Sequence, residues 1–141
     1  MERKVPIFCA VCNACRYGKP CVQNDGFNEI VSEIMEADML VFASPLYFWT
    51  ISSRIKAFIE RFYCIAEKDD NPLFGRYEKY PEKDCALLMT AADNFFWTFE
   101  QVVSYYKFAL VNYIGFHDKE CYWRESAAIR TVNRKLIKPS I

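Results

Sequence analysis

The sequence has a single histidine, only four glycines and no net charge in its 141 residues. Around His117 no Ser-His-Asp or Cys-His arrangement can be argued, and we expect this histidine at a solvent-facing strand edge. The scattered glycines form no G-x-G-x-x-G loop of the kind that cradles a phosphate. The zero net charge does not favour binding to nucleic acid or to an acidic membrane surface, since proteins that bind phosphates usually carry an excess of basic residues on one face.

Long hydrophobic runs are absent as well. No apolar segment approaches the roughly 20 residues that a membrane-spanning helix needs, and the apolar stretch at the N-terminus is too short for a signal peptide. We therefore expect a cytoplasmic protein, in which the seven cysteines are thiols or metal ligands rather than structural disulfides. The hydrophobic content of 52% is ample for a core, and the length predicts one domain over residues 1–141.

Along the sequence, short apolar runs alternate with segments in which apolar residues recur at helical spacing. Residues 39–43 and 85–90 are short, continuously apolar runs, which is typical of strands buried on both faces of a sheet. Elsewhere apolar residues recur at helical spacing, and the alternation predicts an α/β fold with a parallel sheet and right-handed connections. We expect helices over residues 27–35, 55–62, 95–114 and 127–137, a polar loop over 66–84, and a third strand over 117–123.

The loop from Ser44 to Ser53 leaves the first strand at its carboxyl end. Ligands of parallel α/β sheets bind in the crevice outside the carboxyl ends of the strands. Three aromatic side chains of this loop, Tyr47, Phe48 and Trp49, either stack on a planar ligand or fill the core. A second aromatic group, over residues 95–97, either covers the same pocket or forms an oligomer face.

Four of the cysteines, Cys9, Cys12, Cys15 and Cys21, form the pattern C-x2-C-x2-C-x5-C. Thiolates at short spacing can wrap one inorganic core, and ferredoxin-type [4Fe–4S] sites use a C-x2-C-x2-C run with a freer fourth ligand. Free thiols and a zinc site are the alternatives, although zinc usually takes paired knuckles that lie far apart. The remaining cysteines lie in apolar or strand contexts, and we expect them to be buried as small hydrophobic residues: Cys64, Cys85 and Cys121.

The aromatic loop and the helix after it resemble those of a known family. In the flavodoxin-like NAD(P)H-dependent flavin reductases, which include the iron–sulfur flavoproteins, this segment reads roughly S-P-x-Y-(aromatic or small)-x-x-(small)-S-x-x-(basic)-K-x-F-(apolar)-(acid)-R. The cysteine run and the following GKPCVQNDGF also resemble the iron–sulfur flavoproteins, with Gly26 in place of an aspartate. The residues that match the loop and helix pattern are Ser44, Pro45, Tyr47, Phe48, Ser53, Lys56, Phe58, Ile59, Glu60 and Arg61.

This resemblance implies a flavodoxin-like, three-layer α/β/α fold that binds FMN and takes a hydride from NADH or NADPH. Electrons would pass to a quinone, another flavin or an iron–sulfur centre, and no catalytic side-chain acid or base is required because the cofactor supplies the chemistry. The resemblance also implies that the four clustered cysteines hold a [4Fe–4S] cluster. It places the cofactor-binding residues at Ser44, Pro45, Leu46, Tyr47, Phe48 and Trp49 in the first loop, and at Thr90, Ala91 and Asp93 in the second.

Against this family the chain is truncated at its N-terminal side. Members begin with a strand, a Ser/Gly/Asn/Thr-rich loop that binds the flavin phosphate at a helix N-terminus, and another strand, together about 40 residues. Without them we expect weaker FMN binding, and the strand over residues 39–43 becomes an apolar edge that invites pairing. The chain therefore either forms a homo-oligomer across this edge or is a fragment of a longer protein.

Two other functions stay open at this point: an electron carrier without turnover of its own, and a fold remnant without cofactor. Lys56 and Arg61 either touch a phosphate or nicotinamide, or form a helix-face salt bridge such as that of Lys56 with Glu60. Asn24 or Asp25 is expected to cap the first helix.

Overall fold

The computed structural model describes residues 7–71, 78–92, 95 and 97–125, with side chains as far as Glu120. The expected helix over 127–137 and the side chain of Cys121 lie outside this part. The elements are α1 (Phe27–Glu36), β1 (Met39–Pro45), α2 (Ser53–Ile59), the 3-10 turn η1 (Phe62–Ile65), β2 (Glu67–Lys68), β3 (Glu78–Lys79), β4 (Asp84–Ala91), α3 (Glu100–Tyr106), the π-helix η3 (Lys107–Ile114) and β5 (His117–Glu125).

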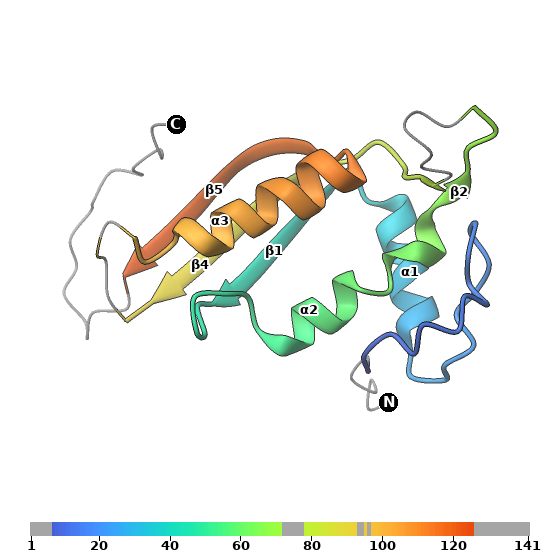
Figure 1. The fold of residues 1–141 in the computed structure, drawn as a ribbon, viewed down its shortest axis with the longest axis horizontal. Helices are drawn as coiled ribbons and strands as arrows, with labels where there is room; N and C mark the ends of the chain where they lie inside the picture. Colours follow the sequence, from blue (N-terminus) through green and yellow to red (C-terminus); the bar gives the residue numbers. More distant parts are fainter. Residues whose placement is uncertain (1–6, 72–77, 93–94, 96, 126–141) are drawn as a thin grey trace.

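Three strands form a parallel sheet in the order β1-β4-β5, and their arrowheads point the same way in Figure 1. This arrangement confirms the predicted α/β class, including the third strand. Pro45 at the end of β1 pairs with Thr90 near the end of β4, so the loops that follow the two strands start side by side. In the part of the chain described, β1 pairs only with β4, and it is therefore the edge strand that the sequence predicts.

Only one face of the sheet is buried by the described helices. Phe42, Leu87 and Met89 pack into a single core with the apolar residues of α1, α2 and α3. On the other face Val41 is 57% exposed and Leu88 46% exposed. The prediction that these strands are buried on both faces is therefore wrong for the residues described, because no described helix covers the second face.

Helix α1 follows the predicted amphipathic pattern, with Phe27 and Ile34 buried in the core. Its N-cap is Gly26, whose φ of 79° is left-handed, so that neither predicted residue takes the cap position. Asp25 nevertheless accepts a hydrogen bond from the Phe27 N–H at 3.3 Å through its side chain. Met35, predicted on the buried face, is exposed because it lies in the last turn, beyond the core.

The third helix is shorter at its start than the predicted span of 95–114. Thr98 N–H donates to the Phe95 carbonyl at 3.0 Å, so the chain enters α3 through a turn. The helix then widens into a π-helix and ends, as predicted, at Gly115, which has a φ of 92°. Similarly, α2 stops at Ile59 rather than at residue 62, and the chain continues through the 3-10 turn η1.

The long loop predicted over residues 66–84 contains two short strands, β2 and β3, which pair antiparallel over two residues each. Strands of this length are too short to show an apolar period in the sequence. Among the described residues, no helix is both long and apolar enough to cross a lipid bilayer.

Candidate functional site

Two loops meet at the carboxyl edge of the sheet, where the sequence places the candidate site. The Leu46 N–H, just after β1, donates to the Thr90 carbonyl near the end of β4 at 2.7 Å. The bond holds the aromatic loop of β1 against the exit of β4. Of the second-loop candidates, Thr90 is exposed and Ala91 is buried, while Asp93 lies outside the described residues.

Ser44 organises this loop from the inside. Its side chain is buried, donates from Oγ to the Pro45 carbonyl at 2.7 Å and accepts from the Ser52 N–H at 2.9 Å. Ser52 in turn caps α2, since its Oγ accepts from the Ile55 N–H at 3.4 Å. The Ser44 hydroxyl thus closes the loop onto the start of α2, and any ligand contact by this residue falls to its backbone.

The tip of the loop is a two-residue turn with an unusual composition. Tyr47 and Thr50 exchange backbone hydrogen bonds of 3.0 and 3.1 Å, and the two residues between them have positive φ, 46° at Phe48 and 60° at Trp49. Such type I′ geometry normally selects Asn-Gly or Gly-Gly. A bulky residue in the left-handed region costs roughly 1–2 kcal/mol, and strain of this kind concentrates at ligand-binding sites.

The turn presents its rings to solvent instead of the core. Phe48 is 93% exposed, and Tyr47 and Trp49 are also exposed. This exposure excludes the alternative that the aromatic loop only fills the protein interior. Trp49 contacts Trp97 from the loop after β4, with ring centroids 5.8 Å apart, and Trp97 stacks on Phe95 at 5.6 Å and 4° between planes.

We call Phe48, Trp49, Phe95 and Trp97 the aromatic platform. From the sequence, Phe95 and Trp97 were expected either to cover a pocket or to form an oligomer face, and they were not among the predicted site residues. The signal for grouping them was present: each aromatic group directly follows one of two apolar runs that become neighbouring parallel strands.

The cysteine segment, residues 9–21, lies at the other side of α2, beside α1 (Figure 1). Cys15 is buried, Cys12 is exposed, and Cys9 and Cys21 are half-buried. Burial raises the pKa of the Cys15 thiol, and the nearby Cys21, Cys9 and Cys12 raise it further.

The donor set of this segment has the chemistry of an iron–sulfur site, since four thiols come from one short loop. Its arrangement is not that of a closed metal site: within the described ranges, no three His, Cys, Asp or Glu side chains are grouped so as to hold a metal ion. The cluster therefore stays a prediction. Cys64 and Cys85 are buried as predicted, and burial raises the pKa of the Cys64 thiol to about 12.

The two basic residues of the family pattern take structural roles in this chain. Lys56 donates to Glu60 at 2.5 Å, which is the salt bridge along the helix face that the sequence offered as one of two alternatives. Arg61, only 1% exposed, forms an ion pair with Asp25.

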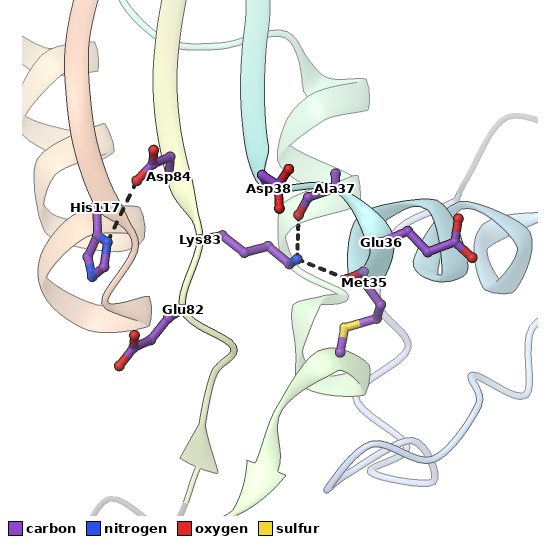
Figure 2. Close-up of a pocket in the computed structure, with 8 residues that line it drawn as sticks. All are labelled: Met35, Glu36, Ala37, Asp38, Glu82, Lys83, Asp84 and His117. Atoms are coloured by element: carbon purple, nitrogen blue, oxygen red, sulfur yellow. Dashed lines mark hydrogen bonds and ion pairs between the residues drawn. The ribbon is translucent and has the colours of Figure 1, made fainter.

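A groove also lies at the opposite edge of the sheet, at the amino ends of the strands (Figure 2). The Lys83 ammonium donates to the carbonyls of Met35 and Ala37 at 3.1 and 2.6 Å, and so ties β4 to the end of α1. His117 lies beside this groove, exposed on β5 and 3.6 Å from Asp84, which agrees with the predicted solvent-facing position. Lys83 in the groove thus serves to join two elements.

Comparison with known proteins identifies the family of this chain. The sequence profile of the NADPH-dependent FMN reductases matches residues 3–92. The chain belongs to this family. Among curated relatives, the chain is 33% identical over 54 residues to an iron–sulfur flavoprotein of Archaeoglobus fulgidus, and 34% identical over 53 residues to one of Methanocaldococcus jannaschii. Each alignment covers 38% of this chain, but only 24% and 28% of those relatives.

A solved structure supports the flavodoxin-like fold of this chain. The Trp repressor binding protein of Bacillus subtilis superimposes with a TM-score of 0.54 at 16% identity, over 72% of this chain and 64% of that one. This likeness supports the fold, which agrees with the fold class predicted from the sequence. The chain spans only about a quarter of the length of the curated relatives it matches.

Proposed function

We propose that this chain is an FMN-dependent NAD(P)H oxidoreductase module whose flavin ring lies on the aromatic platform. The observation that supports the proposal most strongly is the strained turn of Phe48 and Trp49, which holds exposed rings at the carboxyl edge of a parallel sheet. Family membership supplies FMN as the cofactor.

The residues of the site bind and orient a planar ring. Trp49 and Trp97 offer flat apolar surface on two loops that the Leu46–Thr90 hydrogen bond keeps together. Ser44 holds the first loop on α2 from beneath, so its backbone groups are fixed before a ligand arrives. When bound, FMN would supply the chemistry of hydride acceptance, and the chain's own residues position the ring and exclude water from one side.

The nicotinamide donor is NADH or NADPH, and the acceptor is a quinone, a second flavin or an iron–sulfur centre. In the proposed site Ser44 to Trp49 and Thr90, Ala91 and Asp93 contact the cofactor, now joined by Phe95 and Trp97. We also propose a homo-oligomer, because exposed apolar residues line the edge strand β1.

A second candidate function rests on the cysteine segment. Cys9, Cys12, Cys15 and Cys21 would hold a [4Fe–4S] cluster, and the chain would then carry single electrons, with or without a flavin. The names of the two archaeal relatives support this reading, and so does the contact of a buried arginine with Cys21.

The absorbance spectrum of anaerobically purified protein, followed by titration with FMN, tests both candidates. Bound flavin with its two visible bands, reduced by added NADPH, is the result expected for the reductase. A broad brown absorbance that is lost on oxidation is the result expected for a cluster. A colourless protein that binds no added FMN would support the fold remnant and contradict the proposal.

A further inference from the structure

Arg61 is the largest fully buried side chain of the described residues, although it carries a permanent charge. Isolated buried charges are costly, so a guanidinium with 1% exposure must have compensating partners. Its Nη1 pairs with the buried Asp25 carboxylate and also donates to the Ile7 carbonyl at 3.3 Å. The guanidinium carbon lies 3.9 Å from the centroid of the Phe27 ring.

The other terminal nitrogen of Arg61 points to the cysteine segment. Nη2 donates to the Cys21 sulfur at 3.1 Å. The backbone of Cys21 is fixed separately, because the Asn28 side chain accepts from its N–H and donates to its carbonyl, both at 2.9 Å. The sulfur of Cys21 is thus held by Arg61 while its main chain is held by α1.

One N–H donor of the same guanidinium is not used in a hydrogen bond to any residue that the structure describes. Nε is buried and has no hydrogen-bond partner among the described residues. A buried cation with one carboxylate, one sulfur and one unused N–H is suited to a second anionic acceptor beside it. A site of several thiolates, with or without bound iron and sulfide, has this chemistry.

We propose that Arg61 is the positioning residue of the cysteine segment: it fixes the Cys21 sulfur, and its guanidinium, already paired with Asp25, offers the unused N–H to an anionic sulfur site. Where the sulfur site is a cluster, this inference rests on the second function proposed above; the contact with Cys21 stands without it. Arg61 lies just beyond the C-cap of α2, Glu60, while the N-cap of α2 is Ser52, whose N–H donates to the Ser44 hydroxyl. One short helix therefore joins the cysteine segment to the aromatic loop (Figure 1).

A double-mutant cycle tests the contact itself. Arg61→Lys keeps the charge and the pairing with Asp25, but a single ammonium lacks the fork that reaches both Asp25 and Cys21. The loss of stability in the double variant Arg61→Lys/Cys21→Ala should be smaller than the sum of the losses in the two single variants. The expected difference corresponds to about tenfold in the unfolding equilibrium constant. The matched control replaces Cys12, which is exposed, and the cycle of Arg61→Lys with Cys12→Ala should be additive. Additivity at Cys21 as well would overturn the proposal.

A comparison at Cys21 alone serves if Arg61→Lys does not fold. Cys21→Ser keeps an acceptor for Nη2 whereas Cys21→Ala removes it, so the serine variant should be the more stable by about tenfold in the same constant. Serine and alanine at Cys12 should be equal. Equal stability of the two Cys21 variants would contradict the role of Arg61.

Reconstitution with ferrous iron and sulfide tests the hydrogen bonds that Arg61 gives to the sulfur site. Hydrogen bonds to cluster sulfurs raise the reduction potential, so the potential of Arg61→Lys should be lower than that of the wild type and of the exposed control Arg54→Lys. Equal potentials would overturn the proposed hydrogen bonding of Arg61 to the sulfur site. If the wild type takes up no cluster, the second proposed function fails, and the cycle at Cys21 still decides the role of Arg61.

Discussion

At the scale of single residues, the most informative feature is the conflict at Phe48 and Trp49. Their backbone adopts the conformation that Asn-Gly prefers, yet both side chains are large aromatic rings and one of them is almost fully exposed. Neither packing nor backbone preference selects these residues for the turn. A ligand that uses the rings would account for both the strain and the exposure.

Phe48→Asn separates folding from binding at this turn. Asparagine tolerates the left-handed region, so we expect the free energy of unfolding to rise by up to about 1 kcal/mol. FMN affinity should fall at the same time, since one ring of the platform is lost. Urea denaturation and FMN fluorescence titration measure the two effects. A large loss of stability would show that the Phe48 ring packs on the protein.

A second residue-scale prediction concerns Asp118 on β5. This carboxylate accepts from the Tyr106 hydroxyl at 2.9 Å and from the Glu120 N–H at 2.9 Å, and it pairs with Lys107. Burial raises its pKa, but the Lys107 ammonium and these donors outweigh burial and hold the pKa below the usual value for an aspartate. A depressed pKa stabilises the fold above the unfolded value of about 4, and this contribution is lost as the pH falls through the folded pKa.

Asp118→Asn should therefore be less stable than the wild type at pH 6, and the gap should shrink as the pH falls below about 4. Urea unfolding at a series of pH values measures this difference in the free energy of unfolding. Asp70→Asn, at an exposed carboxylate, is the control and should leave the profile unchanged. A gap that does not depend on pH would show that the charge of Asp118 is not what stabilises the fold.

At the scale of elements, the spacing of apolar residues predicted the strands and helices well, but it predicted their first and last residues poorly. The runs at 39–43 and 85–90 became β1 and β4, and the i, i+3, i+4 pattern after Gly26 became α1. The start of α3 was missed because Phe95 and Trp97 continue the apolar pattern while stacking on each other outside the helix. Such stacking depends on the neighbouring loop with Trp49, which no local pattern contains.

A substitution at Gly115 tests whether this glycine is needed to end the helix that runs through α3 and η3. Its φ is 92°, and a Cβ added there would meet no atom within 4 Å, so only backbone strain opposes a side chain. Gly115→Ala should lower the free energy of unfolding by about 1 kcal/mol. Thermal and urea unfolding measure the change. An unchanged stability would mean that the end of η3 relaxes without cost.

At the scale of the whole molecule, the sheet explains both the site and the exposed apolar surface. Parallel register puts Pro45 beside Thr90, and this unites two loops that are over 40 residues apart in the sequence, as the general rule for such sheets anticipates. The contacts of Arg61 could not be anticipated in the same way, because they depend on how residues 7–27 fold back on α2. Resemblance supplied the residues of the two loops that were named as the site, and the ring contacts in the structure added Phe95 and Trp97.

The exposed side of the sheet predicts association. Val41 is 57% exposed on the edge strand, and edges of this kind pair unless they carry charge. We expect the wild type to associate with rising concentration in sedimentation velocity and Val41→Lys to remain monomeric. Phe108→Lys adds the same charge at an exposed position of η3, away from the sheet, and should associate like the wild type. A monomeric wild type would contradict the proposed homo-oligomer.

The central claim is that the aromatic platform holds a flavin ring, and FMN titration of the wild type beside Trp49→Ala/Trp97→Ala tests it most directly. The expected result is binding of one FMN per chain with quenched flavin fluorescence, weakened about tenfold or more in the double variant while its fold is retained. A wild type that binds no FMN, or a double variant that binds it equally well, would contradict the account.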